Sequence, residues 1–174
     1  MVNWVPSGTL FSLKGFVMYS PNYDFDKDLP IAQATEKQVA NFLVEKAKMT
    51  FVHDNDDNKY DLMMKTQGGK SITIEVKEDF SCQRTGNVGV EFECRGKPSG
   101  IEVSQADAYL YKVHEPDGRK GLYVIATKNL KKMIREEQYF RIVCGGDPGS
   151  NSMNYLFRLD VVKNNFKKLG YVNE

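Results

Sequence analysis

Residues 71–77, Ser-Ile-Thr-Ile-Glu-Val-Lys, alternate strictly between polar and apolar side chains. Successive residues of a β-strand point to opposite faces, so one face of this segment is apolar and the other carries Glu75 and Lys77. A glycine-containing turn at residues 67–70 comes directly before it, and residues 60–65 form a second strand candidate. The pattern therefore predicts a β-hairpin with one face against a core.

Helical and extended segments are expected on both sides of this hairpin. Thr35 and Gln38 form a capping-box pattern, which predicts a helix from Thr35 to about Lys48. Extended segments are expected at 49–53, 87–94, 108–113 and 122–126, a short helix at 103–107, and a further helix from Thr127.

This order of elements predicts an α/β fold with a mixed sheet flanked by helices. An N-terminal hairpin or arm is expected over residues 1–33 and a C-terminal extension over residues 138–174. The whole chain, 1–174, is expected to form a single domain with its core at about 34–137.

Charge and cysteine content narrow the function classes. The chain has 24 basic and 23 acidic residues, which excludes a uniformly basic nucleic-acid coat but allows a local basic groove. Its three cysteines form no C-x-x-C pair, so a disulfide framework, a zinc ribbon or an iron–sulfur cluster is not indicated. With neither a long apolar run nor a secretory pattern, we expect a cytoplasmic protein without a membrane partner, in a bacterium or in a virus-infected host.

The hairpin also predicts a cluster of chemically useful groups. Thirteen residues separate Asp61 from Glu75, and pairing of the two strands would bring these carboxylates together beside Lys77. Carboxylate oxygens suit Mg²⁺, and the backbone carbonyl of Val76, between Glu75 and Lys77, is a further candidate oxygen. Lys77 would orient or deprotonate a water, or stabilise charge on a phosphate. The alternative is an exposed cross-strand ion pair, which contributes about 0–1 kcal/mol.

Asp61 followed by Glu75-Val76-Lys77 resembles the motif of the PD-(D/E)XK nuclease superfamily, which includes restriction endonucleases and Holliday-junction resolvases. The resemblance covers about residues 34–126, and Tyr60 stands where the motif has proline. It implies a restriction endonuclease-like fold and metal-dependent DNA cleavage. Asp61 and Glu75 would be the metal ligands and Lys77 a catalytic residue.

Two further acids are expected at the site, and the resemblance implies the first of them. Many relatives carry an acidic residue on the first helix, and Glu36 shares a helix face with apolar residues whereas Glu45 points to solvent. Glu36 is therefore the predicted fourth site residue, unless it is only a favourable acid in a first helical turn. Glu91 is the predicted auxiliary ligand, if the strand at 87–94 adjoins the strand at 71–77.

Cations and turn residues follow the motif. Phosphate binding needs such cations and free backbone amides, but ordinary polar turns have the same composition. The predicted nucleic-acid contacts are Gln83, Arg84, Asn87, Arg95 and Lys97.

The prediction is a Mg²⁺- or Mn²⁺-dependent DNA nuclease, an endonuclease in preference to an exonuclease, with DNA as partner and a homodimer possible. One alternative is a non-catalytic DNA-binding domain that retains the nuclease fold. The other is a structural α/β protein in which the three charged residues form an ion-pair network.

Overall fold

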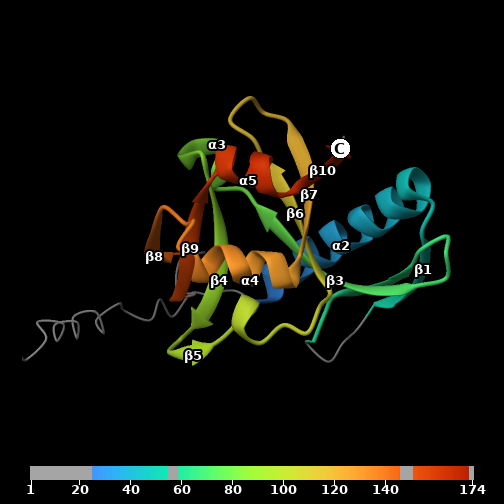
Figure 1. The fold of residues 1–174 in the computed structure, drawn as a ribbon, viewed down its shortest axis with the longest axis horizontal. Coiled ribbons are helices and arrows are strands. Elements are labelled where there is room, and N and C mark those ends of the chain that lie inside the picture. Colours follow the sequence, from blue (N-terminus) through green and yellow to red (C-terminus); the bar gives the residue numbers. More distant parts are fainter. Residues whose placement is uncertain (1–24, 55–58, 146–150, 173–174) are drawn as a thin grey trace, which may run out of the picture.

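A computed structural model describes residues 25–54, 59–145 and 151–172, which form two sheets and the helices that pack on them (Figure 1). The larger sheet has six strands in the order β1-β2-β3-β6-β7-β10. β3 and β6 pair in parallel and the other neighbours pair antiparallel, so this sheet is mixed. Its strands are β1 (Thr50–Asp54), β2 (Leu62–Lys65), β3 (Ser71–Asp79), β6 (Ala108–His114), β7 (Lys120–Ala126) and β10 (Lys167–Tyr171).

The predicted hairpin is confirmed as β2 and β3. Leu62 lies opposite Ile74 and Lys65 lies opposite Ser71, so the turn closes at residues 66–70. β3 runs two residues further than the alternation indicated, to Asp79. The strands expected at 49–53, 108–113 and 122–126 are also present, as β1, β6 and β7.

The strand expected to follow this hairpin belongs to a different sheet. β4 (Asn87–Cys94) pairs with β9 (Ser152–Arg158) and β5 (Lys97–Pro98), and β8 (Arg141–Gly145) completes a four-stranded sheet in the order β5-β4-β9-β8. The short helix α3 (Cys82–Thr85) turns the chain out of the first sheet. A 3₁₀ helix, η1 (Gly100–Glu102), leads back to β6, so the helix expected at 103–107 is wrong.

The first helix begins earlier than the sequence indicated. α2 spans Phe25–Ala47 and continues through Pro30, so the expected arm is wrong for residues 25–33, while residues 1–24 lie outside the described residues. Thr35 is an interior residue of α2 rather than its N-cap. Its hydroxyl donates to the Glu78 carboxylate of β3. A proline near a helix start removes only one hydrogen bond, and packing of a long amphipathic face outweighs that loss.

The six-stranded sheet has a core on each face. α2 packs Val39 and Leu43 against Leu62, Ile74 and Leu110. The opposite face carries a second core, which the four-stranded sheet, α4 (Thr127–Arg135) and α5 (Leu159–Asn165) cover. The members of this core include Tyr109, Tyr111, Tyr123, Val88, Phe157, Leu130 and Val162. The predicted α/β class, a mixed sheet flanked by helices, is thereby confirmed.

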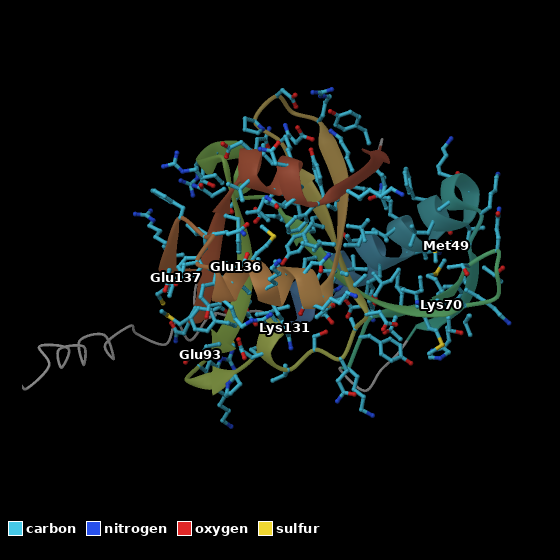
Figure 2. All side chains as sticks on the ribbon, in the orientation of Figure 1. Met49, Lys70, Glu93, Lys131, Glu136 and Glu137 are labelled. Carbon is cyan, nitrogen blue, oxygen red and sulfur yellow. The ribbon has the colours of Figure 1, made fainter. Side chains whose placement is uncertain are left out.

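The predicted C-terminal extension contributes to both sheets, because it supplies β8, β9, α5 and β10. Met49 and Lys70 lie at the end of the molecule formed by α2, β1 and the β2–β3 turn, whereas Glu93 lies on the second sheet at the other end (Figure 2). Among the described residues, no helix is long and apolar enough to cross a membrane.

Asp79 joins the two sheets at the end of β3. Its Oδ1 accepts hydrogen bonds from the Cys82 amide at 2.9 Å and the Ser81 hydroxyl at 2.8 Å, and its Oδ2 accepts one from the Gly89 amide at 2.8 Å. The carboxylate therefore fixes both the turn into α3 and the start of β4.

Replacing Asp79 with alanine is expected to lower the free energy of unfolding by about 2 kcal/mol, because two backbone amides lose a charged acceptor. Urea denaturation measures this loss. Glu45→Ala, which removes an exposed carboxylate from α2, should change stability by less than about 0.5 kcal/mol. Equal effects of the two substitutions would contradict the assigned role of Asp79.

Candidate active site

The hairpin places Asp61 directly across from β3. Asp61 immediately precedes β2, and its amide donates to the Ile74 carbonyl at 3.0 Å. Its Oδ2 accepts a hydrogen bond from the Val76 amide at 2.6 Å. The predicted contact between Asp61 and the Glu75-Val76-Lys77 segment therefore exists, with Val76 contributing its N–H.

Glu75 and Lys77 point to the same face of the sheet because side chains alternate along β3. Lys77 Nζ lies 2.7 Å from Glu75 Oε1, and the Ser104 hydroxyl donates to Glu75 Oε2 at 3.1 Å. The Glu75 side chain is 11% exposed and the Lys77 side chain is 42% exposed. The Glu75 carboxylate is therefore nearly buried and fixed by its two contacts, whereas the Lys77 ammonium group reaches solvent.

The charges of the three residues are coupled. Burial raises the pKa of Asp61, the nearby Glu75 carboxylate raises it further, and Lys77 and the Val76 amide oppose these effects without cancelling them. Burial acts to lower the pKa of Lys77, but the carboxylates of Glu75 and Asp61 outweigh it, and that pKa lies above the ordinary lysine value. Lys77 is consequently protonated at neutral pH.

Sequence reasoning missed two neighbours of this cluster, Ser104 and Tyr109. Tyr109 lies opposite Glu75 in the parallel pairing of β3 with β6. Its hydroxyl is buried without a hydrogen-bond partner among the described residues, and burial is the main cause that raises the pKa of Tyr109 to about 12. No local pattern indicates either contact, because α3, β4, β5 and η1 lie between β3 and β6 in the chain.

Glu36 and Glu91 lie on other elements than the three central residues. Glu36 is on α2, which packs on the opposite face of the sheet from Glu75 and Lys77. Glu91 is on β4, which pairs with β9 and β5 rather than with β3, so the strand pairing expected for it is wrong. Glu91 Oε1 instead accepts a hydrogen bond from the Ser99 hydroxyl at 2.6 Å. A place for either acid at the site stays a prediction.

The donors present fit a divalent cation only in part. Among the described residues, no group of three or more His, Cys, Asp and Glu side chains is arranged to hold a metal ion. Asp61 and Glu75 offer two carboxylates, and burial, with a smaller effect of the Glu75 charge, raises the pKa of Asp61. Two carboxylates with phosphate and water oxygens suit Mg²⁺, which rarely takes an all-protein set of ligands.

The predicted nucleic-acid contacts lie at two ends of β4. Gln83 and Arg84 are exposed on α3, and Asn87 begins β4 with its amide group donating to the Thr85 carbonyl at 2.9 Å. Arg95 and Lys97 are exposed beyond the other end of β4, at β5. α3 and β5 lie well apart (Figure 1), so the five residues do not form one continuous patch.

No protein-family model matches the chain, and no curated protein matches it. Among solved structures, the chain is similar to one described as that of a bacterial homing endonuclease, I-Ssp6803I. The two are 17% identical with a TM-score of 0.41, and the match covers 56% of this chain and 68% of that chain. The geometry of the site, rather than this likeness, is the basis of the function proposed below.

Proposed function

We propose that this protein is a metal-dependent nuclease that hydrolyses phosphodiester bonds within DNA. The observation that carries the proposal is the convergence of Asp61, Glu75 and Lys77 on the β2–β3 hairpin. An ordinary exposed ion pair consists of one carboxylate and one ammonium group. It does not account for Asp61, a second carboxylate that accepts a hydrogen bond from the Val76 amide. The motif-level resemblance to the PD-(D/E)XK superfamily supports the same conclusion.

Asp61 and Glu75 are the residues that would hold Mg²⁺ or Mn²⁺. Burial, and after it the nearby Glu75 carboxylate, disfavours ionised Asp61 and raises its pKa. A bound cation would offset the repulsion between the two carboxylates, and when bound it supplies polarisation of the phosphodiester and a more acidic water. Ser104 fixes the orientation of Glu75 through its hydrogen bond to Oε2.

Lys77 supplies positive charge in this proposal. The carboxylates of Glu75 and Asp61 raise its pKa and favour the protonated ammonium, so the proposal gives it the role of a positive charge rather than that of a base. Its partial exposure allows it to meet a phosphate oxygen while Glu75 holds its position. Stabilising the negative charge that develops on the phosphate is the role that these properties suit.

The substrate class, partners and location are part of the proposal. Arg84, Arg95 and Lys97 would bind phosphates around the site. Cleavage of both strands of a duplex would favour a homodimer. The location in this proposal is the cytoplasm.

The test is a cleavage panel with the full chain. Supercoiled plasmid, linear duplex and a four-way junction are incubated near neutral pH with Mg²⁺, with Mn²⁺, or with EDTA. The proposal predicts nicking or linearisation of the supercoiled plasmid with either metal and none with EDTA, because an exonuclease cannot act on a closed circle. Binding of all three DNA forms without cleavage under either metal would instead favour a non-catalytic DNA-binding domain.

A further inference from the structure

A basic surface lies on the second sheet, beside the junctions of α3 with β4 and of β9 with α5. Phe140, directly before β8, is 49% exposed, and its amide donates to the Leu156 carbonyl at 2.6 Å. The guanidinium carbon of Arg158 lies 4.5 Å from the centre of the Phe140 ring, and that of Arg141 lies 5.6 Å from it. Both guanidinium groups thus lie close to the Phe140 ring. We call Phe140, Arg141 and Arg158 the β8–β9 basic surface.

A shallow pocket of about 430 Å³ adjoins this surface. Arg158 lies opposite Asn87 in the pairing of β9 with β4, so the pocket includes one of the predicted nucleic-acid contacts. Asp160 is the acidic residue on its rim. The residues that line the pocket are Thr85, Gly86, Asn87, Phe140, Arg158, Leu159 and Asp160.

The two arginines lack an acidic partner within the part of the chain that the structure describes. A guanidinium over an aromatic ring uses its flat face, which leaves its N–H groups along the edge available to oxygen acceptors. Arg119 provides a contrast within the same molecule. It also lies over a ring, that of Tyr171 at 4.4 Å, but its guanidinium is paired with Asp117 at 2.6 Å.

The basic surface is connected to the candidate active site through Asp79. Asp79 is two residues beyond Lys77 on β3, and its carboxylate binds the amide of Gly89, two residues beyond Asn87 on β4. Each of these two-residue steps spans about 7 Å along a strand. The two strands therefore link Lys77 to Asn87, which lies opposite Arg158 of the basic surface.

We propose that Phe140, Arg141 and Arg158 form a phosphate-binding surface for the backbone of duplex DNA, outside the bond that is cleaved. This inference rests on the proposed function for its ligand, DNA, but it does not need catalysis. Planar guanidinium groups match phosphate oxygens in geometry as well as charge, and Phe140 limits the motion of both side chains before DNA arrives. Such contacts carry no sequence information.

Binding of a fluorescein-labelled duplex of arbitrary sequence to the full chain tests this inference. Anisotropy is measured in EDTA over a range of salt concentrations, so that cleavage cannot interfere. The variant Arg141→Ala with Arg158→Ala should lower affinity about tenfold or more at moderate salt. It should also reduce the slope of log affinity against log salt by about two, one for each phosphate that an arginine no longer neutralises.

Two single variants sharpen the test. Arg158→Lys keeps the charge, so it should retain the salt slope while losing part of the affinity. Arg119→Ala is the matched control, because its charge is already neutralised, and it should bind DNA as the unmodified protein does. Circular dichroism and thermal melting verify that each variant is folded.

The outcomes separate this inference from the proposed nuclease activity. Unchanged affinity and salt slope in the double variant, or absence of DNA binding by the unmodified chain, overturns the basic surface even if the protein cleaves DNA. Loss of affinity in the double variant supports the surface even if no DNA form is cleaved, in which case only the nuclease proposal fails.

Discussion

Replacing Lys77 with methionine is expected to lower the rate of metal-dependent DNA cleavage by about 10²–10³-fold. Methionine has a similar length and no charge, so the loss reports the ammonium rather than the side-chain volume. Lys77 is the cation of the cluster, 2.7 Å from Glu75 and partly open to solvent. The rate is measured in single turnover with saturating protein, so that weaker DNA binding does not contribute.

A second readout distinguishes a catalytic loss from a structural one. Lys77 lowers the pKa of Asp61, so its removal should raise that pKa above its already raised value. Because the proposed site needs Asp61 ionised, the residual activity of Lys77→Met should fall at a higher pH during acidification than that of the unmodified protein. Lys70→Met, on the exposed turn of the same hairpin, should leave rate and pH profile unchanged. An undiminished rate in Lys77→Met would remove Lys77 from the mechanism.

The hairpin was predictable because its information is local. A strict two-residue alternation, a glycine turn and β-branched side chains all lie within residues 60–77, and each indicates the same strands. The alternation alone predicts that Glu75 and Lys77 point to the same face of the sheet. The hydrogen bond from Val76 to Asp61 follows from the register that the turn imposes.

The separation of β4 from the hairpin depends on distant parts of the chain. Its partner strand β9 begins at Ser152, 65 residues after the start of β4 at Asn87. Alternation identifies β4 as a strand but does not indicate which strand pairs with it. The place predicted for Glu91 required β4 to adjoin β3, and β4 instead pairs with β9 and β5.

The start of α2 shows how tertiary contacts override a local signal. The capping-box pattern of Thr35 and Gln38 indicated a helix start at residue 35. In the structure the Thr35 hydroxyl instead binds Glu78, which also contacts Lys112 at 2.9 Å and His114 at 2.7 Å. This polar cluster between α2 and the sheet satisfies Thr35 inside the helix, so its side chain is not needed as a cap.

Glu115 occupies a second buried polar cluster, which fastens the C-terminal part of the chain to the first sheet. Its carboxylate is fully buried and lies 2.6 Å from Lys163 of α5 and 3.1 Å from Lys168 of β10. The Tyr123 hydroxyl of β7 donates to it at 2.7 Å. Three elements of the fold and the β6–β7 turn thus meet at one carboxylate.

Replacing Glu115 with alanine is expected to lower the free energy of unfolding by about 3 kcal/mol, measured by urea denaturation near neutral pH. The substitution leaves the Tyr123 hydroxyl without its acceptor and removes the counter-charge of two lysines. Because both lysines are partly exposed and can turn to solvent, the loss should lie at the lower end of the range for broken buried pairs. Asp117→Ala is the matched control, since it removes an exposed carboxylate from the same turn and should lower stability far less than Glu115→Ala.

The pH dependence of this difference identifies the charged carboxylate as its source. Burial acts to raise the pKa of Glu115, but Lys163, Tyr123 and Lys168 outweigh it and hold the pKa below the ordinary value. A lowered pKa in the folded state means that the stabilisation is present above the pKa of an unfolded glutamate, about 4.3, and is lost as pH falls through the folded value. The difference in free energy of unfolding between the unmodified protein and Glu115→Ala should therefore be largest near neutral pH and smaller in acid. Glu115→Gln, which keeps an acceptor for Tyr123 but not the charge, should lie between the two. A gap that is constant from neutral to acid pH would show that lost packing, rather than the ion pairs, causes the instability.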